Sequence, residues 1–256
     1  MRFGNVEYEK KGRVAVMRLD EEKKLNILTP GIRQGLFESL SEVESDDDIR
    51  IGIITGTGRS FCAGFDIESL KATGFDPVKT KRMLNKEFFE LTRRIEKHPK
   101  PLIAAVNGFS FGGGLETAIS CDIIIASEKA TFGVPEINIG LLPGFAIVRL
   151  PQLIGAAKSK KMMMTGDPIS AEEAYRLNMI DEVVPHERLM EEAMALAEKI
   201  ASKPAAAIQL GKSAVNREIG SVDYAYAMDS MPFLFATEDT KEGITAFLEK
   251  RKPNFK

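Results

Sequence analysis

The fold class is decided by residues 102–120, LIAAVNGFSFGGGLETAIS, in which an apolar run leads through a glycine-rich turn into a second apolar segment. The run Leu102–Val106 follows a proline and is bounded by Asn107-Gly108, which is typical of a short buried strand. Three glycines follow, and residues Leu115–Ser120 predict a short apolar helix. A buried strand that turns at once into a helix indicates an α/β protein.

The sequence on the N-terminal side extends this pattern. Thr29-Pro30 predicts an N-cap with proline in the first helical position, and the helix it begins should reach about Glu44. A second, longer amphipathic helix is expected at Val78–Lys97. Further strands are expected at Val6–Glu9, Val14–Leu19, Ile51–Thr55 and Asp122–Ala126. Alternating strands and helices again favour an α/β fold.

The C-terminal third has a different character. Ser170 and Glu173 have the spacing of a capping box that begins a helix. Further helices are expected at residues 187–202, 204–218, 223–235 and 239–249, and no strand longer than 182–184 separates them. We therefore expect an α/β core over residues 1–200 and a helical unit over residues 201–256.

Composition excludes several classes of protein. The 256 residues carry 35 Lys and Arg against 37 Asp and Glu, and this balance argues against nucleic acid as the main partner. No apolar run approaches the roughly 18–20 residues that cross a bilayer, and the N-terminus does not resemble a signal peptide. The two cysteines form no CxxC pair, so neither a metal site nor a disulfide is expected. These features predict a soluble cytoplasmic protein.

Histidine chemistry is not favoured. The two histidines, His98 and His186, each lie beside a proline in a charged context, so we expect surface or capping roles for both. A Ser-His-Asp hydrolase would need one of them against a nucleophile, and no GxSxG elbow supplies it.

Two glycine-rich segments are candidate sites. In the first, residues 56–66, Phe61 stands where the third glycine of a dinucleotide-binding GxGxxG would be, so a dinucleotide site is not expected. This segment could be a surface loop rather than a site. In the second, the helix after Gly112-Gly113-Gly114 presents unpaired N–H groups that suit an anion or a developing oxyanion. Glu116 would lie beside whatever those groups bind, although it could simply complement the helix dipole.

A second carboxylate, Glu136, lies among apolar and small residues in the segment 131–140. Acidic residues in such surroundings are paired or functional. If Glu116 and Glu136 face one cavity, they form a pair suited to general acid–base catalysis. Glycosidases also use two carboxylates, but a chain without tryptophan lacks the usual sugar-stacking platform.

Together these segments resemble the crotonase superfamily, and within it the enoyl-CoA hydratase/isomerase family. The resemblance rests on residues 61–67 (FCAGFDI), 105–108 with 112–116, 132–136 (FGVPE) and 246–253 (AFLEKRKP), in the family's order and spacing. It implies a spiral of ββα units with a helical C-terminal region over residues 201–256 that serves trimerisation. The implied assembly is a homotrimer or a hexamer built as a dimer of trimers.

The resemblance also implies roles for individual residues. The backbone N–H groups of Phe65 and Gly113 would form the oxyanion hole for the thioester carbonyl of an acyl-CoA. Glu116 and Glu136 would be the two catalytic carboxylates of 2-enoyl-CoA hydration, which needs no metal or redox cofactor. The implied substrate-binding residues are Ala63, Phe65, Asp66, Ile67, Glu68 and Gly113, with Phe247 and Lys250 contributed by a neighbouring subunit.

The chain departs from the family in one segment. Where the family has a glycine-rich PGxGGTQRL-like sequence, residues 143–150 read PGFAIVRL, one residue shorter and bulkier. Phe145, Ile147 and Val148 could narrow the acyl pocket, but we expect them to pack as core. Phe65 also stands where small residues are more usual, which a hole built from backbone tolerates.

Four functions follow from these patterns. The leading one is a hydro-lyase, an enoyl-CoA hydratase that equally dehydrates 3-hydroxyacyl-CoA. An enoyl-CoA isomerase, or another crotonase-type lyase or hydrolase, would use the same oxyanion hole, often with one carboxylate. A non-catalytic acyl-CoA-binding subunit would need neither acid, and a Clp-like serine peptidase would need a Ser-His pair.

Overall fold

The computed structural model describes residues 1–73 and 76–216 and the single positions 238, 242, 249, 251, 252 and 254. The helices expected at 223–235 and 239–249, together with Phe247 and Lys250, lie outside the described residues. The division into units at residue 200 therefore stays a prediction.

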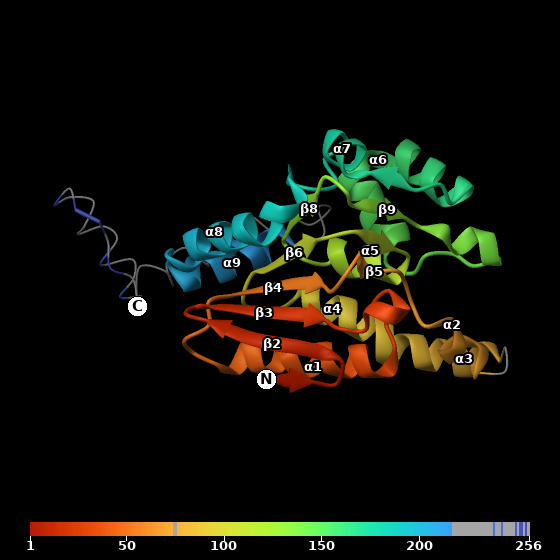
Figure 1. Ribbon diagram of the computed structural model, residues 1–256, viewed down its shortest axis with the longest axis horizontal. Coiled ribbons are helices and arrows are strands. Elements are labelled where there is room, and N and C mark those ends of the chain that lie inside the picture. The colour runs from red at the N-terminus through yellow and green to blue at the C-terminus, as the bar shows by residue number, and fades with distance from the viewer. Residues whose placement is uncertain are drawn as a thin grey trace.

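A seven-stranded sheet forms the centre of the molecule (Figure 1), in the order β1-β2-β3-β4-β6-β8-β11. The first three strands pair antiparallel, and every pairing from β3 to β11 is parallel. Its strands are β1 (Arg2–Phe3), β2 (Val6–Lys11), β3 (Val14–Leu19), β4 (Ile51–Gly56), β6 (Leu102–Val106), β8 (Ile123–Ser127) and β11 (Glu182–Val184). The expected strands are thus confirmed, with ends moved by one or two residues.

A second sheet of four short strands lies beside the first, in the order β10-β9-β7-β5. Its members are β5 (Ser60–Cys62), β7 (Phe109–Phe111), β9 (Thr131–Gly133) and β10 (Ile169–Ser170). The pairs β4–β5, β6–β7 and β8–β9 each place one strand in each sheet and are followed by a helix. Three successive ββα units result, which confirms the α/β spiral that the sequence led us to expect.

Thirteen helical segments are defined within the described ranges. They are η1 (Glu22–Lys24), α1 (Pro30–Ser45), α2 (Ile67–Lys71), α3 (Pro77–Leu84), the π turn η2 (Asn85–Phe89), α4 (Glu90–Glu96), α5 (Gly113–Ile119), η3 (Pro135–Ile139), α6 (Ala146–Thr165), α7 (Ala171–Arg176), η4 (His186–Arg188), α8 (Leu189–Ala201) and α9 (Ala205–Val215). The Thr29 and Ser170 side chains cap α1 and α7 as expected. The expected helix 78–97 is interrupted by the π turn, and α6 was not expected.

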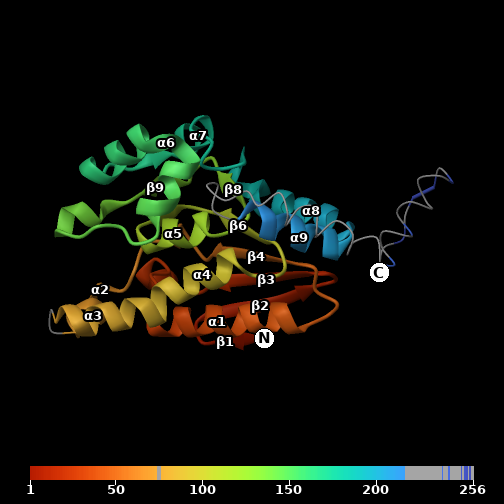
Figure 2. The same cartoon turned by 180° about the vertical axis from the view of Figure 1, so that it is seen from behind.

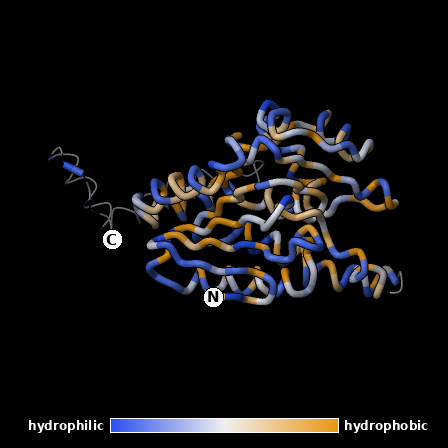
Figure 3. The backbone as a smooth tube through the Cα atoms, viewed as in Figure 1, coloured by the Kyte–Doolittle hydropathy of each residue, from blue (hydrophilic) through white to orange (hydrophobic). Residues whose placement is uncertain are grey.

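Helices cover both faces of the sheet at β3, β4, β6 and β8, whose residues are almost all buried and mostly hydrophobic (Figure 3). In β2 the outward residues Glu7 and Glu9 are exposed. Ile51 and Ile53 of β4 pack in the cluster that includes Ala193 of α8, whereas Ile54 packs in the larger cluster on the other face. Seen from behind, α1 and α4 lie in front of the sheet (Figure 2). No helix in the described part of the chain is long and apolar enough to span a membrane.

Candidate active site

The candidate site lies where the second strands of the three ββα units end. The strands β5, β7 and β9 run parallel, so their carboxyl ends meet at one edge of the small sheet. The segments leaving this edge carry Phe65 after β5, Gly113 after β7 and Glu136 after β9. Residues more than 70 positions apart in sequence, such as Phe65 and Glu136, are brought together in this way.

A cavity of about 450 Å³ opens at this edge. Its wall is mainly apolar and includes both candidate carboxylates and both proposed oxyanion-hole residues. The lining residues are Ala63, Gly64, Phe65, Ile67, Leu70, Thr80, Leu84, Phe88, Phe89, Gly112, Gly113, Glu116, Pro135, Glu136, Asn138, Ile139, Leu141, Leu142 and Gly144. An apolar cavity with a few convergent polar groups is typical of a small-molecule site.

The backbone N–H groups of Phe65 and Gly113 lie next to each other. A Cβ atom added to Gly113 would lie 3.3 Å from the Phe65 nitrogen. Gly113 begins α5, so its N–H has no partner within that helix. Among the described residues, the Phe65 N–H donates to no backbone carbonyl either. Two donors are thus free to bind one oxygen atom.

Gly112 adopts a conformation that only glycine accepts readily. Its φ is 50° and its ψ is −124°, and a Cβ atom there would lie 2.9 Å from Oε1 of Glu136. The glycine therefore lets the start of α5 approach the second carboxylate closely.

Glu116 is almost fully buried, with 2% of its surface exposed. The N–H of Ala146, at the start of α6, donates to its Oε1 at 2.8 Å. Burial raises the pKa of Glu116 to about 7, and the charge of Glu136 acts in the same direction. The hydrogen bond from the Ala146 N–H acts in the opposite direction. A carboxyl with such a pKa can both take and give a proton near neutral pH.

Glu136 is half-buried at the start of η3. Its Oε2 atom is buried and has no hydrogen-bond partner. Burial raises the pKa of this carboxyl above its ordinary value. An unpartnered buried oxygen in a cavity wall is available to a bound molecule.

The remaining expected substrate-binding residues divide into three groups. Ala63 and Ile67 line the cavity. Asp66 does not line it: its carboxylate caps α2 by accepting from the Glu68 N–H at 3.2 Å and the Ser69 hydroxyl at 2.7 Å. Glu68 is exposed and lies outside the cavity wall. Phe247 and Lys250 lie outside the described part of the chain.

Sequence reasoning missed most of the apolar wall. Leu84, Phe88 and Phe89 come from α3 and the π turn, and Leu141 and Leu142 from the loop before α6. The amphipathic pattern of residues 78–97 showed that one face would be covered, but not that it would face a cavity.

The unusual segment 143–150 differs from what we expected. Phe145 is half-buried against the core, but Ile147 and Val148 are 42% and 59% exposed, so the expectation that all three pack as core was wrong. They lie on the outer side of the first turn of α6, whereas Ala146 and Leu150 face inward. Gly144 is the residue of this segment that lines the cavity.

The histidines also differ in part from expectation. His98 is 2% exposed and its ring nitrogens lie 2.9 Å and 3.2 Å from the carbonyl oxygens of Lys100 and Leu40, so it is buried rather than a surface residue. His186 does meet a serine: its Nδ1 lies 2.9 Å from the Ser127 hydroxyl. Ser127 is fully buried and also accepts from the Lys129 N–H, so this pair fastens a turn and offers no accessible nucleophile.

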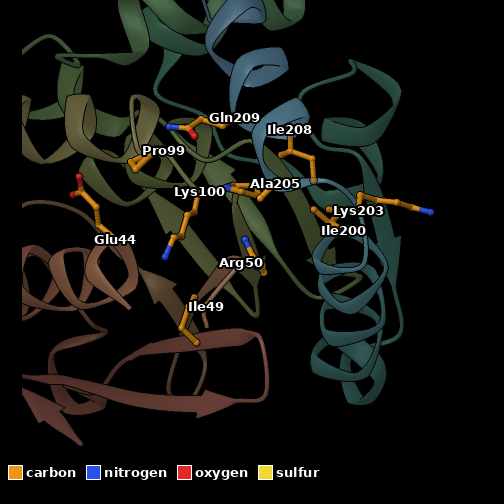
Figure 4. A pocket seen from close by; sticks show the side chains of 11 residues that line it. Glu44, Ile49, Arg50, Pro99, Lys100, Ile200, Lys203, Ala205, Ile208 and Gln209 are labelled. Carbon is orange, nitrogen blue, oxygen red and sulfur yellow. The ribbon is translucent and has the colours of Figure 1, made fainter. Parts of the chain in front are cut away.

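A second cavity of about 270 Å³ lies at the amino end of β6, between α8 and α9 (Figure 4). It contains none of the expected site residues. The Lys100 ammonium on its wall donates to the carbonyls of Val43 and Asp46, and so holds the end of α1.

Comparison with known proteins agrees with this geometry. The profile of the enoyl-CoA hydratase/isomerase family matches residues 9–256. A short-chain enoyl-CoA hydratase of Clostridium acetobutylicum is 41% identical over 98% of this chain and 97% of its own. A crotonyl-CoA hydratase of Syntrophomonas wolfei is 39% identical over 100% and 99%. A crystal structure of enoyl-CoA hydratase from Bacillus anthracis superposes with a TM-score of 0.91 at 32% identity, covering 98% of this chain and 99% of the other.

Proposed function

The chain belongs to the enoyl-CoA hydratase/isomerase family, and from this premise we propose that it is an enoyl-CoA hydratase, a hydro-lyase that adds water reversibly to 2-enoyl-CoA thioesters. One observation carries the proposal. Two carboxylates, Glu116 and Glu136, line the same cavity as the adjacent N–H groups of Phe65 and Gly113. Moving a double bond shifts a proton from one carbon to another and can use one acid–base group, whereas adding water needs a proton taken from water and a proton given to the α-carbon.

The oxyanion hole acts on the thioester carbonyl. When water attacks the β-carbon, negative charge develops on the thioester oxygen. The N–H groups of Phe65 and Gly113 stabilise that charge, and losing one such donor typically costs about 3 kcal/mol. Because these donors belong to the backbone, the chemistry makes no demand on the Phe65 side chain.

The two glutamates exchange one proton each with the substrate. Ionised Glu116 takes a proton from water as its oxygen bonds to the β-carbon. Protonated Glu136 delivers a proton to the α-carbon on the same side, which gives syn addition. Burial raises the pKa of both carboxyls, and the value of about 7 for Glu116 lets that group exchange a proton near neutral pH.

We also propose the surroundings in which the enzyme works. It takes acyl-CoA thioesters and works in the cytoplasm. It needs no redox cofactor because water addition is not a redox reaction, and no metal because backbone N–H groups stabilise the charge on the thioester oxygen. It assembles as a homotrimer or as a hexamer of two trimers. Exposed apolar side chains of α6 that lie outside the cavity wall support burial against another subunit, with Met164 72% and Val148 59% exposed.

The first test follows the absorbance of the conjugated enoyl thioester of crotonyl-CoA. We expect rapid loss with the wild-type protein and at least about a hundred-fold lower kcat in Glu136→Gln. Binding of saturated butyryl-CoA, measured by calorimetry, should stay within a few-fold. Glu191→Gln, at an exposed position on α8, is the matched control and should keep full activity.

Absence of turnover despite tight binding of butyryl-CoA would contradict a short-chain hydratase. Longer, branched and β,γ-unsaturated acyl-CoAs would then be compared. Conversion of the β,γ-isomer without water uptake would establish an isomerase instead.

A further inference from the structure

Arg33 is a buried cation in a helix face that is otherwise apolar. It lies on α1 among Ile32, Leu36 and Leu40, and only 5% of its side chain is exposed. Burying a guanidinium costs free energy unless its hydrogen bonds and ion pairs compensate for the lost hydration. The position of this side chain therefore calls for a physical explanation.

The Arg33 side chain contacts three parts of the candidate site at once. Its Nη1 donates to the carbonyl of Leu28, in the loop before α1. Its Nη2 forms an ion pair with Glu87 in the π turn. Its guanidinium carbon lies 4.8 Å from the ring centroid of Phe65, within the range of a cation–π contact.

Two of these contacts, those with Leu28 and Phe65, converge on one peptide group. Leu28 and Phe65 form an isolated parallel bridge, in which the Leu28 N–H donates to the Gly64 carbonyl at 2.8 Å. The peptide between Gly64 and Phe65 is the one whose N–H faces the cavity. The Phe65 ring is held on a second side by Phe88, edge-on at 5.7 Å between centroids.

We propose that Arg33 is a positioning residue that fixes the direction of the Phe65 N–H. The inference rests on the proposed function, because it concerns the oxyanion hole of that reaction. Arg33 holds the Leu28 segment, which anchors the Gly64–Phe65 peptide. It also holds the aromatic ring of Phe65. The ion pair between Arg33 and Glu87 joins these groups to the π turn. The oxyanion hole and the part of the cavity wall formed by Phe88 are therefore held together.

This role explains the bulky side chain at position 65. Through its contacts with Arg33 and Phe88, the Phe65 ring lets helix α1 and the π turn orient the backbone that carries the N–H. Misplacement of a catalytic group by about 1 Å can cost about a hundred-fold in rate, so the orientation of one donor has a measurable effect.

The test combines kinetics with a spectroscopic probe of the carbonyl. A cinnamoyl-CoA with a para-dimethylamino group absorbs at longer wavelength when its thioester oxygen accepts strong hydrogen bonds. In Arg33→Met we expect kcat for crotonyl-CoA to fall about ten- to a hundred-fold with KM within about three-fold. The red shift of the bound probe should fall by at least half.

Arg94→Met is the matched control. Arg94 also links α4 to α1, through Ser41 at 2.9 Å and Glu44 at 3.3 Å, but it does not contact Phe65. Its kinetics and probe spectrum should match the wild type within about two-fold. Arg33→Lys keeps the charge but not the planar guanidinium, so its kcat and its probe red shift should lie between those of Arg33→Met and the wild type. If Arg33→Met does not fold, Arg33→Lys is used for the test in its place.

A double-mutant cycle isolates the contact itself. Phe65→Leu keeps the backbone N–H and removes the ring. If Arg33 acts partly through that ring, Arg33→Met and Phe65→Leu together should reduce kcat by less than the product of their separate effects.

Three outcomes would overturn the inference in distinguishable ways. A wild type that hydrates crotonyl-CoA and shifts the probe, beside an Arg33→Met that does both equally well, would remove the positioning role alone. A wild type that does neither would overturn the proposed function and the positioning role with it. An Arg33→Met with reduced kcat but an undiminished red shift would also count against positioning.

Discussion

Burial of Glu116 suits this side chain to proton transfer but lowers the stability of the folded protein at neutral pH. Its pKa is raised from the ordinary 4.5 to about 7, chiefly by burial. The folded protein thus holds this proton more tightly than the unfolded chain does. The stabilisation is fully present below the unfolded pKa and is lost as the pH rises through about 7. The group that gives the reaction a base therefore destabilises the fold at neutral pH.

We expect Glu116→Gln to gain stability relative to the wild type as the pH rises. The neutral amide cannot ionise, so the difference in free energy of unfolding should increase by about 3 kcal/mol between pH 4 and pH 8. Urea unfolding followed by circular dichroism at several pH values measures it, and the carboxylates that do not interact with Glu116 cancel in the difference. A difference that stays constant over this range would contradict the expectation.

At the scale of elements, the loop between β4 and β5 depends on amides from elsewhere in the chain. Asn107, just after β6, accepts from the Gly56 N–H at 3.1 Å and donates to the carbonyls of Gly58 and Ser60 at 2.9 and 3.2 Å. Asn26 donates to the Ser60 carbonyl from the other side at 2.8 Å. This loop leads through β5 directly to Phe65, so the two amides support the oxyanion hole from a distance.

Asn107→Leu keeps the number and branching of the side-chain heavy atoms but removes all three hydrogen bonds. The Gly56 N–H and the Gly58 carbonyl then lose this partner, while the Ser60 carbonyl keeps only its bond from Asn26. We expect a loss of about 2–3 kcal/mol in the free energy of unfolding, together with a lower kcat for crotonyl-CoA. Chemical denaturation and steady-state kinetics check the two effects. Gln34→Leu, which removes an exposed amide from α1, is the control and should change stability by less than about 0.5 kcal/mol.

At the scale of the whole molecule, an ion pair fastens α9 to the sheet. The Asp122 carboxylate accepts from the Leu102 N–H and from the Lys212 ammonium, both at 2.7 Å. The side chains are 17% and 8% exposed, so neither is well hydrated. This contact joins residues 90 positions apart, and it holds α9 against the sheet.

Lys212→Met should destabilise the protein by about 3 kcal/mol, because it leaves the Asp122 carboxylate buried without its cation. Urea denaturation at neutral pH measures the loss. Lys199→Met, at an exposed position on α8, should be nearly neutral. Equal midpoints for the two variants would show that the pair contributes nothing to stability.

The sequence by itself determined the local features. Apolar runs located the strands, Thr29 and Ser170 located two helix starts, and glycine-rich turns with Glu116 and Glu136 located the candidate chemistry. These features are encoded by near neighbours: a side chain that caps, a missing Cβ atom, or a periodicity that shows which residues are covered.

Only the tertiary structure decided what those covered faces pack against. It brought Phe88 from the π turn into the cavity wall, joined Arg33 to Glu87 and Phe65, and paired Ser127 with His186. It also left Ile147 and Val148 exposed beside an inward-facing Ala146. Each of these outcomes depends on residues distant in sequence that meet through strand order and helix packing. A hydrophobic pattern specifies that a side chain is buried, whereas its partner is fixed by the topology of the whole chain.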